Sequence, residues 1–302
     1  MKKALYMRVG ITSKKNKGIT LIELLVGLTI AGLVIGASYR TFVSQQKVYE
    51  VQDQVVDMQQ NLRGAVNRMV QEIRMAGFGN ISMMLPSSGA GGSGITVNGT
   101  TYSNVVNPNT PVNGSITFLY GCQVPSAIAV AAQCGQNQIQ VSSLTDSWGN
   151  TLFDTNNRKY ISIGGIESHQ IYAVDNPSKT ISFTPNDTVL YNYPVGTPVF
   201  CIRAITYQIG VVNGTPTLGR DDNTGAGSQP VSDSIESLQF AYFDANGNLI
   251  ANPKTDAAKI RMVNITIVAK ADKPDPDFKE GDHYRRRQVA SNIHLMNMDL
   301  GF

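Results

Sequence analysis

One acidic residue stands inside a membrane-length apolar segment near the N-terminus. Glu23 is the only charged residue between positions 19 and 38, and Gly18 comes directly before this segment. An ionised carboxylate is costly in lipid unless a cation pairs with it. Cleavage of the peptide bond after Gly18 would supply that cation, because Ile19 would then carry a free α-amine. Gly18 and Ile19 are therefore a candidate processing site, and Glu23 is a candidate for pairing with the charge that cleavage would create.

The apolar segment has the length of a single membrane span. Residues 19–37 would form a helix of about 28 Å, close to the hydrocarbon thickness of a bilayer. The preceding 18 residues contain no acid, which by the positive-inside tendency places the N-terminus in the cytoplasm. A simple signal anchor, with Glu23 snorkelling to the interface, is the alternative interpretation. The cations of the leader are Lys2, Lys3, Arg8, Lys14, Lys15 and Lys17.

The position of the cleavage site separates this segment from an ordinary secretory signal. An ordinary signal is cut beyond its apolar run, where residues 36–38 are small. Here, however, the helical pattern continues through residues 39–76. Glycine resists helix, so Gly18 would leave the peptide bond before the apolar run extended and accessible. Cleavage there would keep the membrane helix attached to the mature chain.

In sequence, Gly18, Ile19, Glu23 and the apolar run resemble the class III signal of type IV pilins and type II secretion pseudopilins. The resemblance implies cleavage by a prepilin peptidase between Gly18 and Ile19, and N-methylation of Ile19. It also implies that Glu23 neutralises the terminal amine of a neighbouring subunit. Two positions depart from the family pattern: Ile19 stands where most members have Phe, and Arg40 where many major pilins have Pro.

A weaker resemblance, to PilW-type minor pilins and the related J-type pseudopilins, extends over the C-terminal half. It is carried by the segments IRAITYQI, IESLQFAYFDANGN and KIRMVNITIVAKAD. The resemblance implies a minor pilin, a structural and non-enzymatic subunit without cofactors that helps initiate or cap a pilus. The implied location is the bacterial inner membrane, with a periplasmic C-terminal domain, and the pilus after assembly. The implied partners are prepilin peptidase, other minor and major pilins, the inner-membrane assembly platform and a tip adhesin.

Two other functions stay open on the sequence alone. A minor pseudopilin of a type II secretion system needs the same helix and the same glutamate. A membrane-anchored periplasmic binding protein or enzyme could carry an anchor that only mimics the signal. The filament position, an adhesion or DNA-uptake role, and the choice between pilus and pseudopilus are not fixed by these residues.

The elements around the motif predict an α+β fold, with a long N-terminal helix packed on an antiparallel sheet. We expect a leader at 1–18, a helix at 19–77, a Gly/Ser-rich loop region at 78–114 and a β-rich domain at 115–302. Within the helix, residues 19–38 span the membrane and residues 39–77 are amphipathic. The amphipathic stripe, at spacings of three or four, comprises Val55, Met58, Leu62, Val66, Met69, Ile73 and Ala76. Pairing of Glu72 with Arg68 across one turn is also expected.

Strands are predicted in series through the β-rich region. Asn246 and Gly247 predict a hairpin turn after one of them. The expected strands are 115–120, 138–142, 160–163, 170–174, 180–183, 199–212, 237–244, 259–269 and 286–295.

Other residues with chemical potential form no catalytic pattern. Exported cysteines favour a disulfide, and we expect Cys122 to pair with Cys134, although three pairings are possible with Cys201. The clusters beginning at Asp221 and Asp244 could offer oxygen ligands to calcium, but turn chemistry is the simpler interpretation. The three histidines, at 169, 283 and 294, have no partner spacing and are expected to be surface or sheet residues.

The charge of the chain gives no support to nucleic-acid binding. The formal net charge is +3, and the leader holds six cations and no acid, so the chain from Ile19 onward carries −3. The basic run from Arg285 to Arg287 is more typical of a solvated strand edge than of a nucleic-acid contact. No nucleic-acid partner is therefore expected.

Overall fold

The computed structural model describes residues 18–86, 93–109 and 114–298. Residues 1–17 of the predicted leader and most of the Gly/Ser-rich run therefore lie outside the described residues. The chain divides into two compact units, Met1–Asp53 and Gln54–Phe302. We call the described part of the first unit, residues 18–53, the arm, and the described part of the second unit the head. A single helix, α1 (Leu21–Arg74), contributes to both units.

The half of α1 that belongs to the head is amphipathic, as predicted. Apolar residues at spacings of three and four lie on one face, and that face is buried in the head. Val55 and Val66 of the predicted stripe are partly buried at its margin. The helical residues that are fully buried are Met58, Leu62, Ala65, Met69 and Ile73, with Ala76 just beyond the helix.

A large antiparallel sheet forms most of the head. Its strands follow the order β11-β10-β9-β6-β7-β8-β5, with β4 also paired to β9 and β3 paired to β4. The 15-residue strand β9 is central, because β4, β6 and β10 all pair with it. The bounds are β3 (Val106–Pro108), β4 (Ser115–Ala127), β5 (Gln138–Gln140), β6 (Tyr160–Ile163), β7 (Glu167–Asp175), β8 (Thr180–Phe183), β9 (Pro198–Val212), β10 (Thr215–Asp221) and β11 (Gln229–Asp233).

A second antiparallel sheet contains β12 (Ile235–Phe243), β13 (Met262–Lys270) and β14 (Arg286–His294), in that order. Residues along β13 alternate strictly between buried and partly buried, as its period-two sequence predicts. The predicted turn at Asn246 and Gly247 is present, because Gly247 adopts a positive φ and its N–H donates to Asp244 O at 3.1 Å. A short 3₁₀ helix, η3 (Ala257–Lys259), precedes β13.

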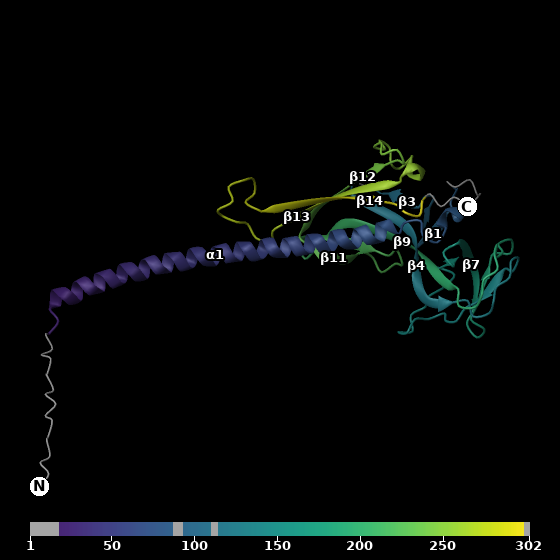
Figure 1. Cartoon of the computed structure of the whole chain (residues 1–302), viewed down its shortest axis with the longest axis horizontal. Helices are drawn as coiled ribbons and strands as arrows, with labels where there is room; N and C mark the ends of the chain where they lie inside the picture. The colour runs from purple at the N-terminus through teal and green to yellow at the C-terminus, as the bar shows by residue number, and fades with distance from the viewer. Residues whose placement is uncertain (1–17, 87–92, 110–113, 299–302) are drawn as a thin grey trace, which may run out of the picture. The chain divides into compact units, whose positions relative to one another are not determined.

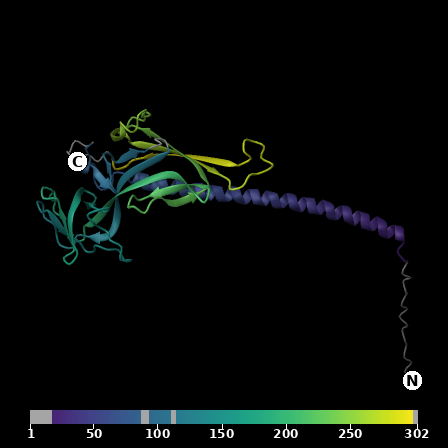
Figure 2. The same ribbon diagram turned by 180° about the vertical axis from the view of Figure 1, so that it is seen from behind.

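The head contains two hydrophobic cores. The helix-side core joins the buried face of α1 to β4, β9 and the β12–β14 sheet, and it includes Leu62, Phe118 and Tyr207. Figures 1 and 2 show that sheet beside the C-terminal half of α1. The lobe core is built from β5 to β8 and the first residues of β9, and includes Phe153, Phe183 and Cys201. We call the part of the head around this second core the lobe.

The expectation of a loop region at 78–114 is wrong for four of its described segments. They form η1 (Ile81–Met84), β1 (Ile95–Val97), β2 (Thr100–Tyr102) and β3, and several of their side chains belong to the helix-side core. The elements are too short to show periodicity, so burial in the head decides their structure. A local signal was nevertheless present at Asn98 and Gly99, which both have positive φ and join β1 to β2.

The sequence analysis also missed strands β10 and β11. Asn213 and Gly214 join β9 to β10 with positive φ at both residues, as a two-residue hairpin turn requires. The same Asn-Gly signal therefore marks three hairpin turns in the head, of which the sequence analysis used one.

Candidate functional site

The candidate processing site lies at the start of α1. Gly18, Ile19 and Thr20 precede the helix, which begins at Leu21. Thr20 Oγ1 accepts a hydrogen bond from the Glu23 backbone N–H at 3.3 Å, and Thr20 O accepts one from the Leu24 N–H at 3.1 Å. Thr20 is thus an N-cap residue, and Thr20-x-x-Glu23 has the sequence of a capping box. Gly18 and Ile19 are left outside the helix.

The position of Glu23 is electrostatically favourable within its own helix, in addition to the pairing predicted with another subunit. It lies in the first helical turn, where the unpaired backbone N–H groups favour a negative charge. Within the described part of the chain, Glu23 forms no ion pair. The predicted cleavage, the methylation of Ile19 and the pairing of Glu23 with a second copy involve other molecules, so they stay predictions. The capping pattern is visible in the sequence and could have predicted where the helix begins.

The apolar side chains of the arm are exposed on every face of the helix. Leu21, Leu28 and Leu33 are each at least 70% exposed, and no residue in the most apolar window of α1 is buried. By length and composition, α1 is the one helix among the described residues that could cross a membrane. Two hydroxyls in this region are satisfied within the helix, since Thr29 donates to Leu25 O at 2.8 Å and Thr41 to Ala37 O at 3.1 Å. These two hydroxyls can therefore lie in an apolar environment without losing a hydrogen-bond partner.

In the head, α1 is fixed to the large sheet through Glu72. Its carboxylate accepts hydrogen bonds from Arg220 Nε on β10 at 3.0 Å and from the Tyr207 hydroxyl on β9 at 2.8 Å. The predicted pair with Arg68 is present but longer, at 3.7 Å. Burial and the negative charge of Glu72 both raise the pKa of Tyr207 above its ordinary value. Burial alone would lower the pKa of Arg220, but hydrogen bonding and charge interaction with Glu72 raise it overall.

The predicted disulfide between Cys122 and Cys134 is not formed in the structure, where all three cysteines are free. Cys122 lies on β4, directly opposite Cys201 on β9. Cys134 lies in an exposed loop, where its N–H donates to Asn192 Oδ1 at 2.8 Å. The prediction of a Cys122–Cys134 disulfide rested on their short separation in the sequence. That separation carries no information on strand register, which places Cys122 opposite Cys201. Burial raises the pKa of the Cys201 thiol to about 11.

The two Asp/Asn clusters are used in turns. Asp244 Oδ1 accepts from the backbone N–H groups of Asn246 and Asn248, at 2.9 and 2.8 Å. Asp221 Oδ1 likewise accepts from the Asn223 N–H at 2.8 Å. In the described residues, no group of three or more His, Cys, Asp or Glu side chains is placed to hold a metal ion. These contacts support the turn interpretation over the calcium interpretation.

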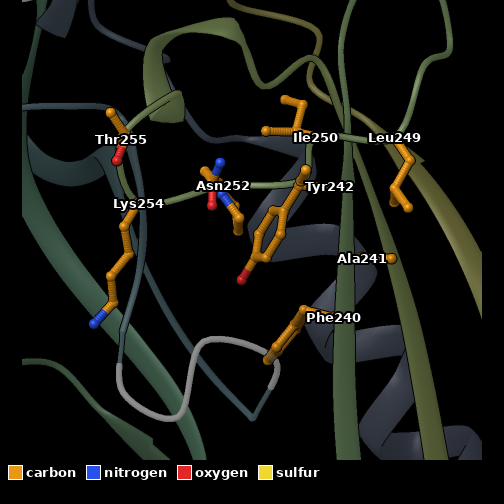
Figure 3. A pocket seen from close by; sticks show the side chains of 10 residues that line it. Phe240, Ala241, Tyr242, Leu249, Ile250, Asn252, Lys254 and Thr255 are labelled. Carbon is orange, nitrogen blue, oxygen red and sulfur yellow. The ribbon is translucent and has the colours of Figure 1, made fainter.

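A surface hollow of about 530 Å³ lies beside β12 in the head (Figure 3). The side chains of Phe240, Tyr242 and Lys254 contribute to its walls. Its lining has no His, Cys, Asp or Glu, so it lacks the side chains that general acid–base or nucleophilic catalysis most often uses. The basic run at 285–287 is also partly neutralised, because Arg285 pairs with Asp275 and Arg286 pairs with Glu236 and Asp282.

Comparisons with known proteins agree with the motif at the N-terminus. The family described as prokaryotic N-terminal methylation motif matches residues 13–39 of this chain. A solved structure of a type IV-like pilin from Thermus thermophilus is similar over 32% of this chain and 68% of that chain, at 15% identity and a TM-score of 0.21. At this TM-score the structural match carries no argument. None of the curated proteins matches the sequence.

Proposed function

We propose that this chain is a type IV pilin-like subunit that is cleaved after Gly18, methylated at Ile19 and assembled through its N-terminal helix. The observation that carries the proposal is the methylation motif matched over residues 13–39, in an arm whose apolar side chains are exposed. The head, by contrast, has two cores of its own. Such a chain supplies an anchor and a folded domain in one subunit.

The exposed arm requires an apolar environment outside the chain. Burying one Leu or Ile side chain contributes roughly 1.5–3 kcal/mol, and the arm exposes more than ten large hydrophobic side chains. A bilayer would cover them before assembly, and the helices of neighbouring subunits would cover them in a filament. The transfer between these two environments is nearly neutral in hydrophobic energy, so polar interactions decide where the arm goes.

Glu23 and the processed N-terminus supply the polar interaction. Cleavage leaves the Ile19 amine at the same end of the arm as the Glu23 carboxylate. Each charge is costly in an apolar environment when alone, and each is neutralised when Glu23 of one copy meets the Ile19 amine of another. This pairing would favour the assembled state and fix the axial register of neighbouring helices.

We assign the chain to the minor pilins, as a subunit that initiates or caps a pilus. The resemblance of the C-terminal half to PilW-type subunits supports this assignment, as does a head large enough to hold two cores. Prepilin peptidase, other pilins, the inner-membrane assembly platform and a tip adhesin are the partners that the proposal implies. The proposed location is the inner membrane, with the head in the periplasm, and the pilus after assembly.

A Glu23→Ala variant tests the assembly step. We expect it to be processed and to accumulate at normal levels, because Glu23 makes no contact with the head. It should fail to enter or prime filaments, measured by immunoblotting of sheared pili and by electron microscopy. Glu50→Ala is the matched control, since Glu50 is also an exposed acid of the arm but lies beyond the apolar run. Normal piliation in the Glu23→Ala strain would contradict the pairing proposal.

A further inference from the structure

Three buried polar side chains in the lobe come together without a complete set of hydrogen bonds. His169 is 1% exposed and Glu167 is 0% exposed, and both lie on β7, two residues apart on one face. Tyr193, from the segment before β9, is 5% exposed, and burial and the nearby charge of Glu167 raise the pKa of its hydroxyl. Glu167 Oε1, His169 Nε2 and the Tyr193 hydroxyl each lack a hydrogen-bond partner among the described residues.

The remaining contacts of His169 are well formed. Its Nδ1 lies 2.8 Å from Asp187 Oδ1, and its ring stacks on Phe183 of β8 with centroids 4.3 Å apart. Its Nε2 faces Glu167 Oε1 at 3.6 Å, and Glu167 Oε2 accepts a hydrogen bond from the Leu190 N–H at 2.8 Å. On β6, the residue opposite His169 is the apolar Ile161. Among the described residues, the titratable groups next to His169 are thus Glu167 from β7 and Asp187 from the chain after β8. Tyr193, also from the chain after β8, lies near Glu167.

The hydrogen-bond partners of His169 indicate the protonation state of its imidazole. Since Asp187 accepts from Nδ1–H, a neutral imidazole would carry a lone pair on Nε2. That lone pair would face the lone pairs of Glu167 Oε1, and neither atom has a hydrogen-bond partner among the described residues. An imidazolium instead directs an N–H at Glu167, and the cation lies between two carboxylates. An acceptor facing an acceptor in a buried site is destabilising, so the protonated form fits the geometry.

The cluster connects β7 to a segment with an apolar surface. Residues 187–197, which we call the latch, begin at Asp187 and carry the exposed side chains of Leu190, Tyr191 and Val195. With Ile166, the latch lines a hollow of about 560 Å³ that has no charged residue in its lining. Asp187 and the Leu190 N–H connect the latch to the cluster on β7, and backbone hydrogen bonds pair the latch with residues 128–136 on its other side.

We propose that His169 is a proton-operated lock: its imidazolium stabilises the cluster that ties the latch to β7, and loss of the Nε2 proton to water weakens that tie. This inference goes beyond the proposed function and does not depend on it. Burial alone would lower the pKa of His169, but hydrogen bonding and charge interaction with Asp187 and Glu167 raise it overall. A raised pKa in the folded state means that the stabilisation is complete below the unfolded value, about 6.5, and is lost as pH rises through the folded value.

Hydrogen–deuterium exchange of the full-length chain in detergent micelles tests the lock. Peptides covering the latch are compared with peptides covering β13, from about pH 5.5 to about pH 8.5, after correction for the intrinsic exchange rate. We expect latch protection to fall up to about tenfold per pH unit above about 6.5, while β13 protection stays constant. The pH dependence should disappear in His169→Gln and persist in His294→Gln, because His294 is exposed on β14.

Two further measurements keep the test decisive. If His169→Gln does not fold, the ring protons of His169 in the unmodified chain are titrated by NMR, and the lock requires a pKa above about 6.5. Exchange is also repeated with EDTA, because a metal ion could bridge Glu167 Oε1 and His169 Nε2. The proposal is overturned by pH-independent latch protection, by a His169 pKa at or below the ordinary value, or by latch protection that EDTA removes.

Discussion

The arm and the head meet within one helix, but they bury their apolar side chains by different means. Leu28 in the arm is 72% exposed, whereas Leu62 in the head is 1% exposed. In the first part of the arm, residues 19–38, apolar residues occupy nearly every position, so a sheet packed on one side of the helix would leave its other sides uncovered. In the head, they recur every three or four residues and form one face. The pattern of the apolar residues, more than their number, therefore separates a segment that needs other molecules from one that completes its own fold.

Truncating a leucine in each region should give the largest contrast. Leu62→Ala would leave a cavity in the helix-side core and lower the free energy of unfolding of the head by about 2–5 kcal/mol. Leu28→Ala should leave that free energy unchanged, because Leu28 belongs to the arm and is already exposed. Chemical denaturation of both full-length variants in the same detergent measures the difference. Equal destabilisation by the two substitutions would contradict the division into arm and head.

Removing the contact between α1 and the large sheet should have an intermediate effect. Arg220→Ala leaves the Glu72 carboxylate, whose side chain is 18% exposed, with its main charged partner missing. We expect the head to lose about 1–3 kcal/mol of unfolding free energy. Arg68→Ala is the control, because Arg68 is 50% exposed and its contact with Glu72 is longer, so its loss should stay below about 1 kcal/mol. A larger effect for Arg68 than for Arg220 would show that Glu72 is anchored by the helix and not by the sheet.

The smallest expected effect lies at the start of the arm. Thr20→Ala removes the hydroxyl that accepts from the Glu23 N–H, and loss of an N-cap weakens a helix by about 1 kcal/mol. The first turn should fray, seen as faster amide exchange at residues 21–24, while the unfolding midpoint of the head stays the same. Thr20→Ser should restore protection, since serine caps at least as well. Unchanged exchange in Thr20→Ala would show that the cap contributes nothing to the start of α1.

The sequence predicted those parts of the fold that depend on a local pattern. The amphipathic half of α1, the alternation in β13 and the turn at Gly247 follow directly from periodicity and turn chemistry. Strands of three residues, such as β1 and β2, are too short for a period and were interpreted as loop, although Asn98 and Gly99 marked their turn.

Contacts between residues far apart in the sequence could not be predicted from local patterns. Glu72 meets Arg220 across 148 positions, and Cys122 lies opposite Cys201 only because β4 and β9 pair in that register. His169 was expected to be a surface or sheet residue, and it is a buried sheet residue. Its carboxylate partner Asp187 is 18 positions away, so no spacing rule connects the two. The candidate processing motif is different, because Gly18, Ile19 and Glu23 act within one short segment and can be recognised without the fold.

The central claim is that the chain is processed between Gly18 and Ile19, and the N-terminus of the mature protein tests it most directly. Intact-mass and peptide mass spectrometry are applied to the chain purified from membranes of cells with an active prepilin peptidase. We predict an N-terminal peptide that begins at Ile19 and carries one methyl group on its α-amine. A chain that still begins at Met1, or one cut beyond the apolar run at residues 36–38, would contradict the account.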